Sequence, residues 1–262
     1  MTSTSTTPKT APRSRGRQLG FTALAALLAL ATAIGMGGVF ALIGVFTAAD
    51  EAVIHRIHSL HWGVLMVVLL GAPLAALAVR PRVAPAQQVA VVVAAFVLAA
   101  LAGMVIDPVL IVFPVLTAAL LALHPEGRGV FRGGEGLSPM LATLAAAVSL
   151  PSLWYALGQI QIHLAAPLAD PHRGPPEHHY IGAAALVLAI SGVAWLVALR
   201  TPGWRLSAWS VGLATVLNGL GSVLLPDYAG SFGPGWGAAA VVWGVAVISA
   251  AVLIGPRRDE GA

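Results

Sequence analysis

The feature of this sequence that most limits its fold is a series of long apolar runs, of which residues 19–49 form the first. One helix needs about 20 apolar residues to cross a bilayer core about 30 Å thick. Runs near that length recur along the chain, and 9% of the residues are charged, against about 25% in a typical soluble protein. The sequence therefore predicts an all-α, polytopic integral membrane protein.

Charges, prolines and glycines divide the apolar sequence into eight predicted transmembrane helices. The apolar stretch from Val89 to Leu123 is interrupted by Asp107 and Pro108; it is too long for one span and barely long enough for two, so we predict two spans joined by a tight hairpin. The predicted spans cover residues 20–47, 62–79, 88–106, 108–123, 140–162, 180–199, 206–225 and 236–254.

The basic residues orient these spans, because cytoplasmic loops of membrane proteins are enriched in Lys and Arg. With the N-terminus inside, twelve of the fourteen basic residues are cytoplasmic, and only Arg56 and Arg173 are outside. We therefore predict a multi-pass protein of the cell (plasma) membrane with both termini in the cytoplasm. The basic residues form no nucleic-acid-binding pattern, so the lipid bilayer is the expected partner and nucleic acid is not.

Two stretches of the chain suggest an internal repeat. "HRIHSLHW" (55–62) and "HRGPPEHHY" (172–180) both read His-Arg, an insert and a His followed by an aromatic residue, and each precedes an apolar run. Arg80 and Arg200 are 120 residues apart, as are Asp107 and Asp227. This spacing predicts a 4+4 parallel repeat about an axis along the membrane normal. The alternative is that arginines recur independently at cytoplasmic helix ends.

The predicted organisation has five parts, beginning with a Ser/Thr/Pro-rich segment that lacks the residues to form a core. They are a disordered cytoplasmic tail (1–18), a first four-helix half (19–124), a cytoplasmic linker (125–138), a second four-helix half (139–255) and a cytoplasmic C-terminal tail (256–262).

Histidine is concentrated on the predicted outer face, where seven of the eight histidines fall. Residues three or four apart share one face of a helix, so Glu51, His55 and His58 are expected to converge. The chain has no cysteine, which leaves imidazole and carboxylate as ligands suited to Zn or Cu. The predicted metal ligands are Glu51, His55, His58, His61, His172, His178 and His179. The alternatives are a solvated interfacial surface or a histidine-based pH sensor.

Four further polar residues are expected to have structural roles. Asp107 and Asp227 lie beside prolines at helix ends, where a carboxylate can cap backbone amides. Asn218 and Gln159 lie within predicted spans, where an amide usually forms hydrogen bonds between helices. No ionisable residue is expected near the membrane midplane, which argues against a proton-coupled transporter. A small-solute transporter remains one alternative function.

The predicted four-plus-four layout, with "IHR" at Ile54–Arg56 before the second helix, resembles the architecture of haem A synthases. That resemblance implies a haem-handling redox protein or enzyme as a second alternative. The chain departs from that family, which also uses histidines on helices 4 and 8, because its predicted helix 8 contains none. The sequence assigns no catalytic residue. It favours an extracytoplasmic His/Asp/Glu cap that binds a transition metal or senses pH.

Overall fold

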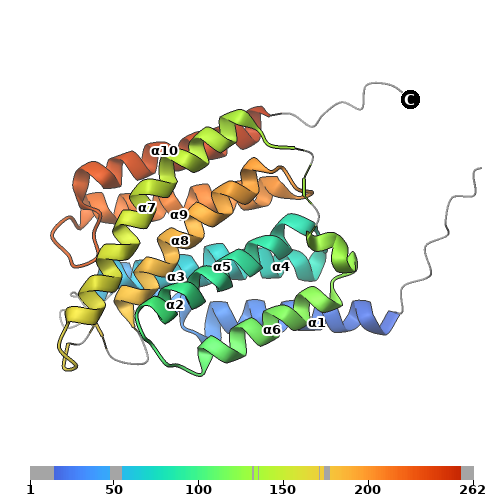
Figure 1. The fold of residues 1–262 in the computed structure, drawn as a ribbon, viewed down its shortest axis with the longest axis horizontal. Coiled ribbons are helices and arrows are strands. Elements are labelled where there is room, and N and C mark those ends of the chain that lie inside the picture. Colours follow the sequence, from blue (N-terminus) through green and yellow to red (C-terminus); the bar gives the residue numbers. More distant parts are fainter. Residues whose placement is uncertain are drawn as a thin grey trace, which may run out of the picture.

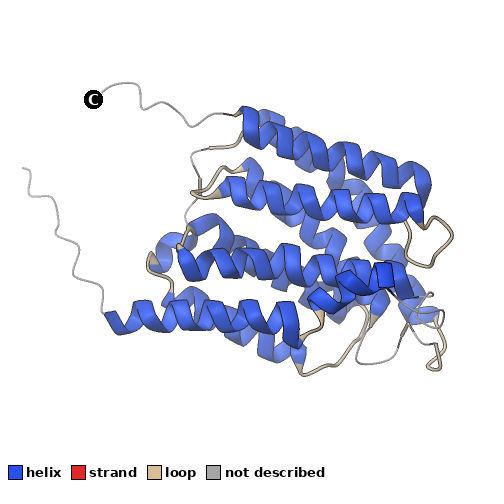
Figure 2. Cartoon of the chain, turned by 180° about the vertical axis from the view of Figure 1, so that it is seen from behind, coloured by secondary structure: helices blue, strands red, loops and turns tan. Residues whose placement is uncertain are grey.

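The computed structural model of the protein describes residues 15–47, 55–131, 133–134, 136–170, 172–173 and 178–254. All regular secondary structure within these ranges is helical, and Figures 1 and 2 show an elongated bundle of roughly antiparallel helices. The elements are α1 (Arg15–Leu30), η1 (Ala31–Gly35), α2 (Gly38–Thr47), α3 (Arg56–Gly63), η3 (Val64–Gly71), α4 (Ala72–Val79), α5 (Val83–Ala102), α6 (Val109–Leu123), η4 (Gly127–Phe131), α7 (Pro139–Ala165), α8 (His179–Ala198), α9 (Trp204–Leu224) and α10 (Gly233–Leu253).

Seven continuous helical segments in the described ranges are long and apolar enough to cross a membrane, which confirms the predicted all-α class. They are Arg15–Val45, Arg56–Val79, Val83–Ala102, Pro139–Ala165, His179–Ala198, Trp204–Leu224 and Gly233–Leu253. Helix α6, with 15 residues, is apolar but shorter.

The bundle has an inner and an outer set of helices. The continuous α3, η3 and α4 segment, with α5, α8 and α9, is the most buried. Helix α8 packs on α5 (Figure 1), and α9 packs on η3. The outer helices expose large apolar side chains such as Phe40 on α2, Ile111 on α6 and Trp154 on α7. An outer surface of this kind suits contact with lipid rather than water.

The first helical segment is interrupted at the sequence "GMGG" (35–38). Gly37 has φ +69°, a conformation that favours glycine, and Trp62 donates a hydrogen bond of 2.9 Å to the Met36 carbonyl that the interruption exposes. A Cβ atom on Gly38 would lie 2.9 Å from Cβ of Met66. The glycines therefore both break the helix and permit its close packing against η3.

A buried polar contact ties the two inner layers together. The π-helical hydrogen bonding of η3 changes the pattern of its backbone bonds, and Ser210 of α9 donates to the Val68 carbonyl at 2.6 Å. The Gln88 amide of α5 donates both to the Leu69 carbonyl and to Ser210 Oγ. These bonds fix α5 and α9 against the same turn of η3.

Helices α9 and α10 approach one another through reciprocal glycines. A Cβ on Gly219 would lie 2.6 Å from the Gly237 carbonyl oxygen, and a Cβ on Gly244 would lie 2.5 Å from that of Gly212. Because only glycine permits this separation, the pairs set the distance between the two backbones over two turns of each helix.

The structure explains where two of the predicted helices begin, α6 and α3. The helical structure is interrupted before Asp107, as predicted, and Asp107 Oδ1 accepts the Val109 N–H at 2.7 Å at the start of α6. The second helical segment begins at Arg56, before the predicted residue 62, since Ile57 and Leu60 are buried and Leu60 packs against Gly221 of α9. This packing keeps the histidine-rich stretch helical.

Candidate metal site

One end of the bundle, here called the histidine end, brings together the start of α3, the end of α7 and the start of α8 (Figure 1). The opposite end contains the start of α1, the end of α10 and the turn between α4 and α5. Seven histidines lie at the histidine end, whereas His124 lies at the opposite end after α6. The fold therefore collects residues that are more than 100 positions apart in the sequence.

Four imidazoles form a compact group that we call the four-histidine cluster. It consists of His55, His58, His172 and His179. The ring of His55 lies 4.7 Å from that of His172 and 4.8 Å from that of His179, measured between ring centroids. His58 lies 5.0 Å from each of the same two rings. Two histidines from the start of α3 thus face two from the region that leads into α8.

His58 is the most enclosed member of this cluster, with 1% of its surface exposed. Among the residues described, neither of its ring nitrogens has a hydrogen-bond partner. Gly230, whose φ of +85° favours glycine, brings its backbone against the ring on the α9–α10 side. A buried polar atom without a partner carries a free-energy cost of about 1–3 kcal/mol, so such a ring is unusual unless a ligand or water satisfies it.

His172 is held by a carboxylate in an arrangement typical of metal-binding histidines. Its backbone N–H donates to Asp170 Oδ1 at 2.8 Å, and its ring Nδ1 lies 3.1 Å from the same oxygen. Within the described chain the other nitrogen, Nε2, is buried and has no hydrogen-bond partner. A carboxylate on one ring nitrogen orients the ring and leaves the second nitrogen available to a metal.

The charge on Asp170 follows from the same contacts. The His172 backbone N–H lowers the pKa of the Asp170 carboxyl below its usual value, and this effect outweighs the opposing effect of burial. The His172 ring and the Tyr180 hydroxyl, 3.5 Å from Oδ2, add to the lowering. Asp170 is therefore ionised at neutral pH, and its Oδ1 can accept a hydrogen bond from the Nδ1–H of His172.

His61 lies one helical turn beyond His58 and is also 1% exposed. Its ring is 6.1 Å from that of His58, stacks on Phe232 at 5.8 Å and meets the edge of Tyr155 at 6.4 Å. In the part of the chain described, both of its ring nitrogens lack hydrogen-bond partners. His61 is therefore next to the four-histidine cluster but enclosed mainly by aromatic rings.

His178 was predicted as a ligand, but the structure places it in a separate group. Its Nδ1 lies 3.1 Å from the Arg173 carbonyl oxygen, and its Nε2 lies 3.9 Å from Asp107 Oδ2. Its ring neighbour is His163 of α7, at 6.1 Å. Asp107 thus both caps α6 and faces a histidine, a second role that the sequence did not suggest.

The remaining predicted residues have varied surroundings. Glu51 lies outside the described residues. Asp227 is exposed in the turn between α9 and α10. Asn218 is fully buried and its amide donates to the Ala214 carbonyl at 2.8 Å within its own helix, while Gln159 is buried on α7. No interhelical hydrogen bond is found for either amide among the described residues, and the side-chain oxygens of both have no partner there.

Sequence reasoning gave too little weight to Asp170 and to His163. The pattern Asp-Pro-His at 170–172 was a usable signal for a carboxylate next to a histidine, whereas only the fold brings His163 of α7 close to His178. Over the ranges that the structure describes, no three His, Asp or Glu side chains already converge on one point as they would around a bound ion.

Comparisons of this chain with models of protein families, with curated proteins and with solved structures find no match.

Proposed function

We propose that this chain is a multi-pass membrane protein that binds a transition-metal ion through the four-histidine cluster. The observation that carries the proposal is the contact of His58 with His172 at 5.0 Å, each with a buried ring nitrogen that forms no hydrogen bond within the described residues. Neutral imidazole is the ligand form preferred by Zn²⁺ and Cu²⁺. Asp170 supplies the carboxylate that orients one of the ligands.

The rings do not yet surround a common point, so binding requires rotation of imidazoles about their side-chain torsions. Contacts of 4.7–5.0 Å between ring centroids leave little space for other groups among the four rings. A metal ion that enters between the four rings would separate them, and bonds from the ring nitrogens to the ion would replace the contacts between rings. His55 and His58 would supply ligands from α3, and His172 and His179 from the region before α8.

A haem does not fit this arrangement. The four rings are packed against each other, and the described residues that line the large cavity between α7 and α10 include no histidine. The last predicted span contains no histidine at all. A porphyrin in that cavity would therefore lack an axial imidazole, and a single metal ion is the better-supported ligand.

We further infer an eight-span topology in which the histidine end is extracytoplasmic. Helix α6 would be the fourth span, completing the connection between α5 and α7. Support for the orientation comes from the placement of Arg80, Arg82, Arg200 and Arg205 at the end opposite the histidines. The inner helices are the second and third of each predicted half, which supports a 4+4 repeat.

The test is metal content after purification in mild detergent from cells grown with added zinc or copper. We expect a stoichiometric metal in the wild type, measured by mass spectrometry, and its loss in His172→Ala. His124→Gln is the matched control, because it also removes one imidazole but at the opposite end of the bundle.

Two outcomes would overturn the proposal. One is the absence of metal from wild-type protein under metal-replete conditions. The other is equal loss of metal in His172→Ala and His124→Gln. If the metal-free protein instead changes its hydrogen-exchange protection at the histidine end on mild acidification, the histidines are supported as a pH sensor.

A further inference from the structure

The second half of the bundle contains a large cavity away from the four-histidine cluster. It has a volume of about 790 Å³ and lies between α7, α8, α9 and α10. Pockets that bind small molecules usually have volumes of about 300–1,000 Å³. Its lining residues Pro151 and Thr215 lie near the middle of α7 and α9. The cavity is therefore within the helices long enough to cross a membrane.

The cavity opens toward the outside of the bundle between α7 and α10. Trp154 of α7 is 83% exposed and Trp236 of α10 is 64% exposed, and both line the cavity. In a membrane this opening would face acyl chains rather than water. A ligand must then reach the site from the bilayer, so it must be soluble in lipid.

The lining combines aromatic rings with hydrogen-bond acceptors. Three of the seven tryptophans, Trp154, Trp236 and Trp243, line it together with Tyr155 and Phe232. These rings offer flat apolar surfaces for an aromatic ligand, since aromatic pairs gain energy from offset or edge contacts.

The acceptors arise from the backbone and from hydroxyl groups. Pro151 has no N–H, so the carbonyl of Ala147, four residues earlier, lacks its usual helical donor, and both residues line the cavity. Thr215 already donates its hydroxyl proton to the Val211 carbonyl at 2.8 Å, which leaves the oxygen as an acceptor. The cavity therefore favours a ligand that brings hydroxyl donors.

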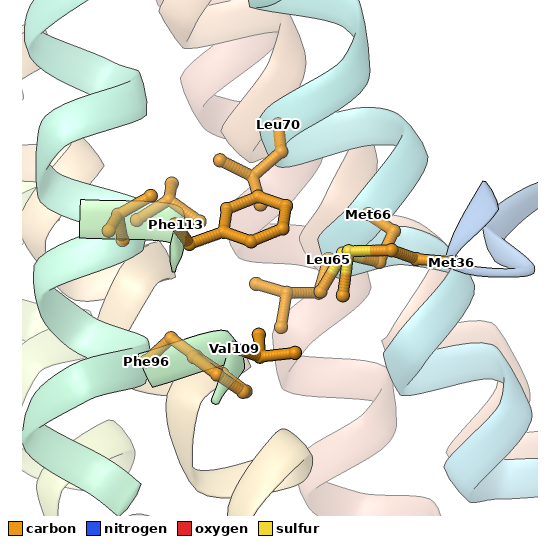
Figure 3. A pocket seen from close by; sticks show the side chains of 9 residues that line it. Met36, Leu65, Met66, Leu70, Phe96, Val109 and Phe113 are labelled. Carbon is orange, nitrogen blue, oxygen red and sulfur yellow. The ribbon is translucent and has the colours of Figure 1, made fainter. Parts of the chain in front are cut away.

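The first half of the bundle provides an internal comparison. The corresponding space among its four helices has a volume of about 10 Å³ and is lined by side chains that include Met36, Phe96 and Phe113 (Figure 3). The spacing of 120 residues that relates Arg80 to Arg200 also relates Leu70 of this space to Ile190 of the large cavity. The space is open near Ile190 and almost closed near Leu70. The open cavity is therefore not a feature that helix packing imposes on both halves.

We propose that this cavity binds a membrane-soluble hydroquinone with an isoprenoid tail. The aromatic headgroup matches the aromatic lining, its two hydroxyl groups match the acceptors of Ala147 and Thr215, and its tail would leave through the opening between α7 and α10. Tyr155 and Phe232 form a wall shared with His61, which places the ligand beside the histidine end. The inference does not depend on metal binding.

The probe is decylubiquinol, added to the purified full-length protein in detergent under anaerobic conditions and followed by quenching of tryptophan fluorescence. We expect saturable binding by the wild type, with the oxidised decylubiquinone binding several-fold more weakly because it has no hydroxyl donor. Ala240→Phe places an additional ring in the cavity and should weaken binding strongly. Ala238→Phe is the matched control, because Ala238 is an exposed neighbour on α10 outside the lining.

A second variant keeps the proposal testable if Ala240→Phe fails to fold. Thr215→Val removes one acceptor with little change in volume and should weaken binding of the reduced form more than that of the oxidised form. Equal binding by wild type and a folded Ala240→Phe would overturn the proposal. So would a failure of Thr215→Val to reduce the preference for the hydroquinone, or recovery of only phospholipid or haem from the cavity.

Discussion

Replacing Asp170 with Asn tests whether the carboxylate beside His172 belongs to a metal site. The substitution keeps an oxygen that can accept the His172 N–H, which is 2.8 Å from Asp170 Oδ1, so the local turn should persist. It removes the charge that faces His172 Nδ1 at 3.1 Å. The ring then loses its charged acceptor, and its Nε2 becomes a weaker and less well-oriented ligand.

The size of the effect follows from the exposure of the carboxylate. Loss of a residue that orients a metal-binding histidine typically weakens metal affinity about 10–100-fold. The Asp170 side chain is 22% exposed, so solvent partly screens its charge, and we expect the lower end, about tenfold or about 1.4 kcal/mol. The assay is competition for zinc against a fluorescent chelator at neutral pH, with the protein in lipid nanodiscs.

Asp227→Asn is the matched control for this experiment. Asp227 is exposed in the turn between α9 and α10, and its substitution removes the same formal charge at the histidine end without touching His172. If the two variants weakened zinc binding equally, the effect would be general electrostatics and the reasoning would be refuted. Unchanged affinity in Asp170→Asn would refute it as well.

Three further predictions concern stability and topology. His61→Leu should leave the melting temperature of the metal-free protein unchanged or raise it, since no hydrogen bond of the described chain is lost; a fall of several degrees would contradict this. Gly219→Val should lower the melting temperature by separating α9 from α10, whereas Gly235→Ala, with open space around its Cβ position, should not; equal effects would refute the close packing. In this cysteine-free chain, a single cysteine at Ser231 should react with an impermeant thiol reagent applied outside intact cells, and one at Ser138 should not; the reverse pattern would invert the topology.

Much of the helical framework can be predicted because each helix is encoded locally. The apolar runs have the length of a membrane span, and the Asp107-Pro108 pair interrupts the run between α5 and α6. Boundaries at the histidine end were harder to predict, because the polar stretch 55–61 resembles a loop in isolation. Burial of Ile57 and Leu60 against other helices extends α3 through it, and no local pattern reveals that packing.

The candidate site was predicted in composition but not in arrangement. The sequence indicated that His55 and His58 share a helical face, yet it could not decide between His172 and His178 as their neighbours. The backbone decides this: His178 adopts φ +36° and ψ +50° before α8, and its ring lies near Asp107 and His163. His172 instead lies in the cluster, and its carbonyl oxygen accepts a hydrogen bond of 3.1 Å from the backbone N–H of His179.

The packing between helices differs between the region of η3, α5 and α6 and the region of α7, α8, α9 and α10. Met36, Phe96 and Phe113 help to line a space of only about 10 Å³ in the first region (Figure 3), whereas the cavity among α7, α8, α9 and α10 has a volume of about 790 Å³. The four-histidine cluster lies where the start of α3 meets the approach to α8, so it brings together histidines more than 100 positions apart in the sequence. His61 lies between the cluster and the open cavity, in contact with Tyr155 and Phe232. A change in the cavity that moves either aromatic ring would therefore reach His58 through a single intervening side chain, that of His61.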